Sequence, residues 1–237
     1  MKKINLLKDG NGKYVKNIDF NRTWSVSHSL RFLSFAHVVV SNNFKTVLDI
    51  GFGDNQLVKY LEKLNFKGHY LGLDLNQKFV DVANKKKINN FHTKYRCANI
   101  NKIKTKFDCI VCGEIIEHIP KNEVNSFLLK IKSLLNKNGK IIISTPNKQN
   151  NILVWPDDHI EEFSLSELKN HFIDVGLNID ISMGLWNNTE NTKETLNSVQ
   201  LKQYSFFSQL IPNSILNVFF NILNPEESRQ IIILLSK

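Results

Sequence analysis

VLDIGFGDN, at residues 47–55, joins an apolar run to two closely spaced glycines. Residues 45–50 (KTVLDI) predict a buried strand, and residues 55–65 carry the apolar spacing of an amphipathic helix. Gly51 and Gly53 stand between them, where glycine permits a tight turn and lets a ligand approach the backbone without a Cβ in the way. The stretch therefore predicts a strand, loop and helix that together form one side of a ligand site.

The same alternation of strand and helix continues through the chain. The hydrophobic periodicity and the turn residues between periodic segments predict strands at 45–50, 69–74, 95–100, 107–113, 140–145, 177–183 and 230–235. They predict helices at 55–65, 78–88, 122–136 and 164–175. We expect Asn138-Gly139 to cap the third helix, and Ser164 and Glu167 to form a capping box at the start of the fourth. Phe163 and Leu168 are placed as its hydrophobic staple. Such alternation implies an α/β fold with a seven-stranded, mainly parallel sheet and helices on both faces.

A second anchor for a ligand is the acid that ends the next predicted strand. Asp74 lies 21 residues after Gly53, and a carboxylate there can accept hydrogen bonds from both ribose hydroxyls of a nucleoside. The alternative is that Asp74 caps the helix that follows. Ligands of such sheets bind beyond the carboxyl ends of the strands, where both features lie, so we favour ribose binding.

These motifs resemble those of the class I S-adenosyl-L-methionine-dependent methyltransferases. VLDIGFGDN is similar to that family's first motif, which faces the methionine part of the cofactor, and GLDLN at 72–76 is similar to the second, which holds the ribose. The likeness covers roughly residues 44–184 and the final strand. It implies a Rossmann-like fold and a cofactor site made of Asp49, Gly51, Gly53, Asn55, Asp74, Leu75, Asn99, Ile100 and Glu114.

The sequence departs from the family pattern at two places. Asn55 stands where a third small residue is common, and Asn tolerates unusual backbone angles better than most residues. Asn99 stands where an Asp usually meets the adenine amino group, and its side-chain oxygen can still accept that hydrogen bond. The amide of Ile100 could serve the ring nitrogen. A nicotinamide enzyme is the competing interpretation, but it would want glycine in place of Gln56.

A polar cluster interrupts the apolar segment FDCIVCGEIIEHIP at 107–120, which resembles the family's fourth motif. Glu114, Glu117 and His118 are spaced so that one helical turn would place all three on one side. His118, or His159 further along, is a candidate general base for the acceptor, with Glu117 beside it. Two alternatives remain: a divalent metal on these residues, as in the small-RNA 3′-end 2′-O-methyltransferases, or a purely structural role. The interpretation adopted assigns no metal.

The segments that flank the core are predicted to cover it. We expect one domain over residues 1–237, with an N-terminal cap at 1–43, a cofactor-binding core at 44–184, a helical lid at 185–226 and a final strand at 227–237. In the cap, Leu30, Leu33 and Val38 are expected to pack on the sheet, while Arg31 or His28 could instead meet a carboxylate or phosphate. The lid has an apolar face that could bury an acceptor or form a homodimer contact: Phe206, Phe207, Leu210, Phe219 and Phe220.

The composition indicates which classes of partner are expected. The 237 residues carry a formal net charge of +9, but the lysines are spread along the chain, so nucleic acid is compatible and not favoured. No apolar stretch has signal-peptide or membrane-spanning length, so we expect a cytoplasmic protein without a transmembrane segment. Cys109 and Cys112 form a C-x-x-C within a strand-like run, and with Cys97 we expect plain thiols.

The sequence therefore predicts methyl transfer from S-adenosylmethionine to an O or N nucleophile of a small-molecule or glycan-like acceptor. The alternatives are a metal-assisted RNA 2′-O-methyltransferase and a cofactor-binding homologue without turnover.

Overall fold

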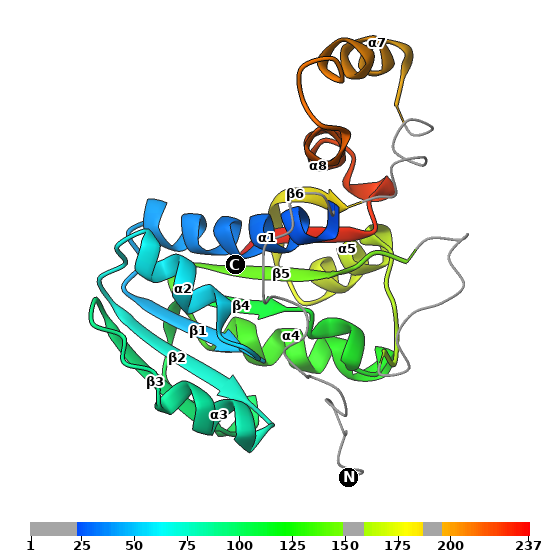
Figure 1. Ribbon diagram of the computed structural model, residues 1–237. Coiled ribbons are helices and arrows are strands. Elements are labelled where there is room, and N and C mark those ends of the chain that lie inside the picture. The colour runs from blue at the N-terminus through cyan, green and yellow to red at the C-terminus, as the bar shows by residue number, and fades with distance from the viewer. Residues whose placement is uncertain (1–22, 149–158, 187–195) are drawn as a thin grey trace.

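A single mixed sheet organises the chain. The computed structural model describes residues 23–148, 159–186 and 196–237. In the described residues the strand order is β3-β2-β1-β4-β5-β7-β6 (Figure 1). β7 runs antiparallel to β5 and β6, and the pairs β1–β2, β1–β4, β2–β3 and β4–β5 are parallel. The predicted α/β class is confirmed. The strands are β1 (Thr46–Ile50), β2 (His69–Asp74), β3 (His92–Cys97), β4 (Phe107–Gly113), β5 (Leu135–Pro146), β6 (Asn178–Trp186) and β7 (Gln230–Ser236).

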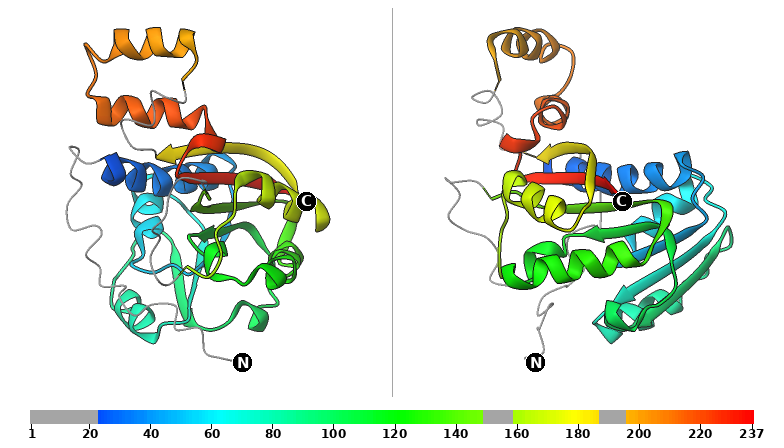
Figure 2. Two further views of the ribbon diagram at one scale, coloured as in Figure 1. Left: turned by 90° about the vertical axis from the view of Figure 1, so that its right-hand side faces the viewer. Right: turned by 180° about the vertical axis from the view of Figure 1, so that it is seen from behind.

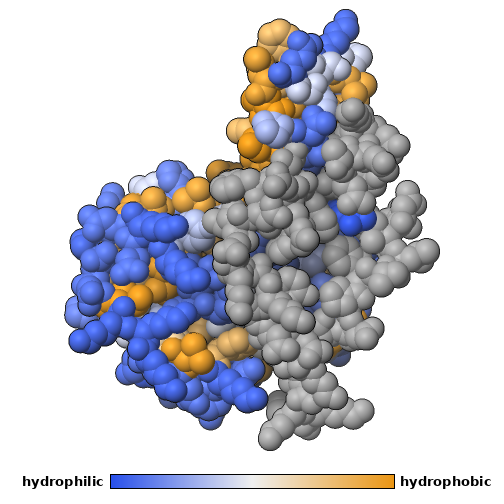
Figure 3. Space-filling view, viewed as in Figure 1, coloured by the Kyte–Doolittle hydropathy of each residue, from blue (hydrophilic) through white to orange (hydrophobic). Residues whose placement is uncertain are grey.

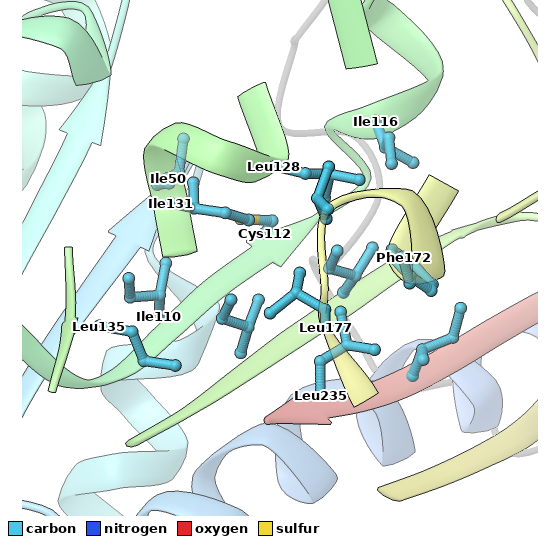
Figure 4. Close-up of a cluster of buried hydrophobic side chains, with 14 of the residues drawn as sticks. Ile50, Ile110, Cys112, Ile116, Leu128, Ile131, Leu135, Phe172, Leu177 and Leu235 are labelled. Atoms are coloured by element: carbon cyan, nitrogen blue, oxygen red, sulfur yellow. The ribbon is translucent and has the colours of Figure 1, made fainter. Parts of the chain in front are cut away.

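Helices cover both faces of this sheet, and each face has its own buried core. α1, α2 and α3 pack on one face, and α4 and α5 on the other, where they lie in front of the sheet when the molecule is seen from behind (Figure 2). Figure 4 shows the core under α4 and α5, in which Leu128, Ile131 and Phe172 meet Ile110 and Leu235 of the strands. The helices are α1 (Thr23–Ser41), α2 (Gln56–Lys63), α3 (Gln77–Asn84), α4 (Val124–Ser133), α5 (Leu165–Asp174), α7 (Ser198–Phe207) and α8 (Asn213–Ile222), with short 3-10 turns at Ile100–Lys102, Ile116–His118, Lys121–Glu123 and Pro225–Glu227.

Several predicted boundaries are wrong: the helix expected at 78–88 ends at Asn84, the strand expected at 140–145 begins at Leu135, and the strand expected at 177–183 extends to Trp186. The helix expected at 122–136 ends at Ser133, and Asn138-Gly139 is no helix cap because β5 begins at Leu135. Gly139 instead lets two strands approach, since a Cβ there would lie 2.7 Å from the carbonyl oxygen of Asp108. The third strand starts earlier than expected, at His92, because its partner β2 pairs His69 with His92.

The capping box and the cysteines behave as predicted. Ser164 accepts a hydrogen bond from the Glu167 amide, and the Glu167 carboxylate accepts one from the Ser164 amide. Cys109 belongs to the core under α1 and α2, whereas Cys112 belongs to the core under α4 and α5. The two thiols are buried on opposite faces of β4 and are free, which agrees with plain thiols.

α1 confirms the predicted N-terminal helix but not every contact expected of it. Phe35, Ala36 and Val39 are buried against the sheet, with Leu30 and Val38 partly buried beside them. Leu33 is exposed, contrary to expectation, and it borders an open groove that Phe35 and Ile232 also line. Residues 1–22 of the predicted cap lie outside the described residues.

α7 and α8 form a unit with a small core of its own, made by Leu196, Tyr204, Leu216 and Phe220. α8 packs on β6 and α1, whereas α7 stands out from the sheet (Figure 1). Figure 3 shows apolar surface gathered over this unit. Of the predicted apolar face only Phe220 is buried, and the exposed members are Phe206, Phe207, Leu210 and Phe219. None of the helices in the described ranges is long and apolar enough to cross a membrane.

Asn147 joins three segments at the carboxyl end of β5. Its Nδ2 donates to the carbonyl oxygens of Pro225, Glu226 and Ser228 at 2.7–3.2 Å, and its Oδ1 accepts from the amide of Leu165 at 3.2 Å. The side chain is buried. It therefore holds the start of α5 and the turn before β7 against the end of β5.

We expect Asn147→Asp to lower the free energy of unfolding by about 3 kcal/mol, because a carboxylate would face three carbonyl oxygens without a donor. Asn147→Ala should lower the free energy of unfolding by about 2 kcal/mol, since the three carbonyl oxygens then lose the amide group that donates to them. Urea denaturation measures both values. Asn178→Asp, on an exposed residue of β6, is the control and should change stability by less than about 0.5 kcal/mol. Equal effects of the two Asp variants would refute this role of Asn147.

Candidate cofactor and acceptor site

The loop after β1 has the backbone shape that its glycines predict. Gly51 and Gly53 have φ of 70° and 54°, in the left-handed region that glycine enters without strain. Asn55 follows with φ 68°, so it does adopt the unusual angle that Asn tolerates. Its Nδ2 donates to the Tyr95 hydroxyl at 2.8 Å, whereas its buried Oδ1 has no hydrogen-bond partner within the described part of the chain. The loop thus places glycine backbone and one unpartnered acceptor beside the strand ends.

Asp74 connects this loop to the end of β2. Its Oδ2 accepts from the Gly53 amide at 3.1 Å and its Oδ1 from the Asn76 amide at 2.8 Å. The N-cap of α3 is Asn76, whose side chain accepts from the Lys78 amide, so Asp74 does not cap that helix. A carboxylate has about four acceptor positions, which leaves each oxygen of Asp74 free to take a further donor.

Asp49 is a buried residue near the carboxyl end of β1. Its Oδ2 accepts from the Tyr70 hydroxyl at 2.7 Å. Burial raises the pKa of Asp49 to about 7, while the Tyr70 hydrogen bond opposes that rise. Sequence reasoning missed Tyr70, because its pattern shows only an apolar strand residue.

Three further residues expected at the cofactor, Leu75, Asn99 and Ile100, lie just past the ends of β2 and β3. Leu75 is 51% exposed and follows Asp74 directly. Asn99 is exposed, caps the 3-10 turn that begins at Ile100, and accepts from the Asn101 amide at 2.9 Å. Both strand ends therefore present side chains at the edge where Asp74 lies.

Glu114 is oriented differently from the expectation. It follows β4 with φ 55°, and no helical turn contains it together with Glu117 and His118, so the predicted shared face is wrong. Its carboxylate pairs with Arg31 of α1 at 3.0 Å and accepts from Ser144 and Gln230 at 2.9 Å each. Arg31 thus meets a carboxylate of the chain itself, and a contact of Arg31 or His28 with a ligand stays a prediction. These bonds hold α1 to the carboxyl ends of β4 and β5 and to the amino end of β7.

Glu117, His118 and His159 come together, although 41 residues separate the last two. One ligating atom of each lies within 4.8 Å of those of the other two. Glu117 is 1% exposed, and its Oε2 accepts from the Thr145 hydroxyl at 3.0 Å. Burial, together with the nearby Glu114 carboxylate, holds the pKa of Glu117 well above its usual range.

The hydroxyls of Ser144 and Thr145 contact the two carboxylates, which the sequence analysis did not predict. They end β5 side by side, and each donates to one carboxylate of the fourth motif. The contacts pair residues about 30 positions apart, which only the parallel pairing of β4 with β5 brings together.

His28 of α1 lies beside Arg31, and burial and the Arg31 charge lower its pKa to about 3. Arg31 Nη2 donates to its Nδ1 at 2.9 Å, so the neutral imidazole is the form that fits. The unfolded chain takes up this proton below pH 6.5 and the folded chain does not. Folding stability from His28 is therefore present at pH 7 and lost as the pH falls.

We expect the free energy of unfolding to fall by about 2 kcal/mol more between pH 7 and pH 5 in the natural chain than in His28→Gln. The Gln oxygen can still accept from Arg31. The raised pKa of Asp49 acts in the opposite direction, so the difference between the two chains is the quantity to measure. His37→Gln, on an exposed position of α1, should follow the natural chain. Parallel curves for all three proteins would contradict the buried neutral imidazole.

Comparison with known proteins identifies relatives that match part of the chain. It is 35% identical over 105 residues to a ubiquinone biosynthesis O-methyltransferase of Pelagibacter ubique, covering 43% of this chain and 42% of that one. It is 27% identical over 130 residues to an uncharacterized protein of Methanocaldococcus jannaschii, covering 51% of this chain and 35% of the relative. The matches thus span less than half the length of these curated relatives.

Solved structures share the fold at low identity. A magnesium protoporphyrin IX methyltransferase from Synechocystis with bound SAH has a TM-score of 0.61 at 14% identity, covering 93% of this chain and 89% of that one. A 1,6-didemethyltoxoflavin N1-methyltransferase of Burkholderia thailandensis has a TM-score of 0.57 at 14% identity, covering 92% and 81%.

A family model described as a methyltransferase domain matches residues 22–180, which is more than half of the chain. The matched range contains the glycine loop after β1, Asp74 and the fourth motif. The chain therefore belongs to the family of methyltransferase domains.

Proposed function

We propose that this protein transfers the methyl group of S-adenosylmethionine to an O or N nucleophile of a small-molecule or glycan-like acceptor. One observation carries the proposal: the left-handed glycine loop after β1 is hydrogen-bonded to the carboxylate that ends β2. This arrangement leaves a backbone surface open for the cofactor and an acid in reach of its ribose.

The residues at the strand ends fit that cofactor. The heavy atom nearest to a Cβ placed on Gly53, within the described residues, is the Gly51 carbonyl oxygen at 3.9 Å, so the loop is open on that side. The buried Oδ1 of Asn55 can accept a hydrogen bond from the methionine part, and exposed Leu75 can pack on the adenine. The remaining expected contacts are Asp49, Gly51, Ile100, Asn99 and Glu114.

The chemistry asks little of the protein beyond alignment and removal of a proton. When bound, S-adenosylmethionine supplies an already activated methyl group. Glu117, His118 and His159 lie past the end of β4, the strand that neighbours β1, and are the groups to meet the acceptor. In the absence of an ion, one of the two imidazoles would take the acceptor proton as a general base.

A small-molecule acceptor is favoured by the names of the similar proteins. They are a ubiquinone biosynthesis O-methyltransferase, a porphyrin methyltransferase and a toxoflavin methyltransferase. The α7–α8 unit comes between β6 and β7 in the chain. We propose that this unit covers the acceptor. A homodimer through its exposed apolar face and a single domain over residues 1–237 both stay predictions.

Methyl transfer from radiolabelled S-adenosylmethionine tests the proposal. The purified chain is incubated with separate pools of small metabolites, glycans and total RNA, and label is followed into each pool. We expect label in the metabolite or glycan pool and its loss with Asp74→Ala. Label in RNA alone would exchange the acceptor class, and no label in any pool would count against turnover.

A further inference from the structure

We propose that the outer face of α7 docks on a lipid bilayer with anionic headgroups, and that the acceptor is a compound dissolved in that bilayer. The outer face consists of Val199, Lys202, Phe206 and Phe207, together with Leu210 in the turn that follows α7. The inference rests on the proposed function, because it names the class of acceptor that the α7–α8 unit would cover.

Large apolar side chains are exposed on this face. Val199, Phe206, Phe207 and Leu210 are 63%, 61%, 40% and 75% exposed. Phe206 and Phe207 follow Val199 by seven and eight positions, which is the spacing of a single helix face. Figure 3 shows apolar surface gathered over the unit. A contiguous apolar surface of this kind marks an interaction site, because water solvates it poorly.

The outer face of α7 points away from the core of its own unit. Tyr204 is the buried residue of α7, and its ring lies 5.3 Å from that of Phe220 in α8, measured between centroids. The Tyr204 hydroxyl donates to Asn217 of α8 at 2.7 Å. Tyr204 comes five positions after Val199, so the two side chains point to different sides of the helix. Because α7 also stands out from the sheet, its outer face is accessible to a flat surface (Figure 1).

The charge of the unit fits an anionic surface. Residues 196–224 contain a single charged side chain, the exposed Lys202, and no Asp or Glu. Lys202 comes four positions before Phe206, so the ammonium group lies beside the apolar side chains on the helix surface. A lysine in this place reaches the headgroup phosphates while the phenyl rings enter the acyl region. The formal net charge of +9 adds a long-range attraction to the same headgroups.

The area of the face favours a bilayer over a second copy of the chain. At these exposed fractions the four apolar side chains present roughly 400 Å², about half of the 800 Å² that each partner buries in a standard stable interface. Other apolar side chains are exposed elsewhere on the unit, namely Leu201, Phe219 and Leu223. A rigid protein surface covers one side of a helix, whereas acyl chains surround each side chain that enters them. A bilayer therefore buries more of this unit than the predicted homodimer would.

The unit is joined to the candidate site through α1. α8 packs on α1 and β6, and Ser27 of α1 donates to the carbonyl oxygen of Leu185 in β6 at 2.8 Å. One turn further along α1, Arg31 pairs with Glu114 past the end of β4 at 3.0 Å. The docking face and the end of β4 therefore belong to one packed structure. An acceptor suited to this arrangement has an apolar part that dissolves in the bilayer and a hydroxyl or amine that takes the methyl group.

Flotation of the purified full chain with lipid vesicles tests the docking face. Vesicles of phosphatidylcholine alone are compared with vesicles that also contain phosphatidylglycerol. We expect the natural chain to float with the anionic vesicles, and Phe206→Ser to lower its partition coefficient about tenfold or more. Lys202→Gln should lower it about fivefold, in the anionic vesicles only. Ile173→Ser, at a 70% exposed position of α5, and Lys78→Gln, at an exposed position of α3, are the matched controls and should float as the natural chain does.

Three results would overturn the docking face. They are a natural chain that floats with neither kind of vesicle, an equal loss in Phe206→Ser and Ile173→Ser, and a dimer that Phe206→Ser dissociates while no vesicle binds. Light scattering without lipid detects such a dimer and would assign the face to a second copy. Circular dichroism shows whether the variants are folded, and Leu210→Ser replaces Phe206→Ser if that variant is not.

The acceptor class is tested with radiolabelled S-adenosylmethionine and vesicles that carry a total lipid extract. We expect label in the extract, and a lower rate of labelling in Phe206→Ser at unchanged affinity for S-adenosylmethionine. Label confined to water-soluble compounds would overturn the acceptor class. Failure of the proposed function is distinguishable: a chain that floats with vesicles and does not bind S-adenosylmethionine would refute the cofactor site and leave the docking face standing.

Discussion

Replacing Asp74 with alanine is expected to weaken binding of S-adenosylmethionine about a hundredfold. The change removes a charged acceptor for two ribose hydroxyls, and two such hydrogen bonds together contribute about 3 kcal/mol. The change also removes the hydrogen bond that the Gly53 amide donates to Asp74 at 3.1 Å, so the glycine loop loses its link to the end of β2. Calorimetric titration of the variant and the natural chain measures the loss.

Two further variants separate the contributions of Asp74. Asp74→Asn keeps the shape and removes the charge, so we expect a loss of about tenfold. Asp81→Ala, on an exposed turn of α3, is the control and should bind as the natural chain does. Unchanged affinity in Asp74→Ala, with the protein folded, would remove the basis of the cofactor assignment.

The second large effect concerns the contact between the α7–α8 unit and strand β6. Gly184 lies in β6, and a Cβ placed there would clash with the Ser228 hydroxyl and with the carbonyl oxygen of Asn221. Ser228 in turn donates to the carbonyl oxygens of Asn221 and Asn224 at 3.1 and 2.8 Å. A side chain at 184 must therefore push away the backbone at the end of α8.

We expect Gly184→Val to lower the free energy of unfolding by about 3 kcal/mol and to speed amide hydrogen exchange in α8. Exchange in α4 and α5 should change much less, because they pack on the opposite side. Asn178→Val introduces the same residue at an exposed position of the same strand and should leave both quantities nearly unchanged. Exchange in α8 as slow as in the natural chain would show that the stability of α8 does not depend on its contact with Gly184.

Local patterns in the sequence predict the first part of the site well. The turn at Gly51 and Gly53, the left-handed Asn55 and the capping box at Ser164 each depend on neighbours within a few residues, and the structure confirms them. The roles of these residues toward a cofactor stay predictions. Their placement beside Asp74 follows from the parallel pairing of β1 and β2.

Contacts between distant segments could not be read in the same way. The ion pair of Arg31 with Glu114 joins an N-terminal helix to a strand end, and nothing in either local pattern names the other. The helix predicted through residue 136 failed because Leu134 and Leu135 continue its apolar spacing, while strand pairing with Phe107 takes Leu135 into β5. In both cases tertiary contacts outweighed the local signal.

The central claim is tested most directly by calorimetric titration of the purified full chain with S-adenosylmethionine and with its demethylated product. We expect one saturable site for each compound, with a dissociation constant in roughly the micromolar range. A folded chain that binds neither compound at millimolar concentration would contradict the assignment of the glycine loop and Asp74 as a cofactor site.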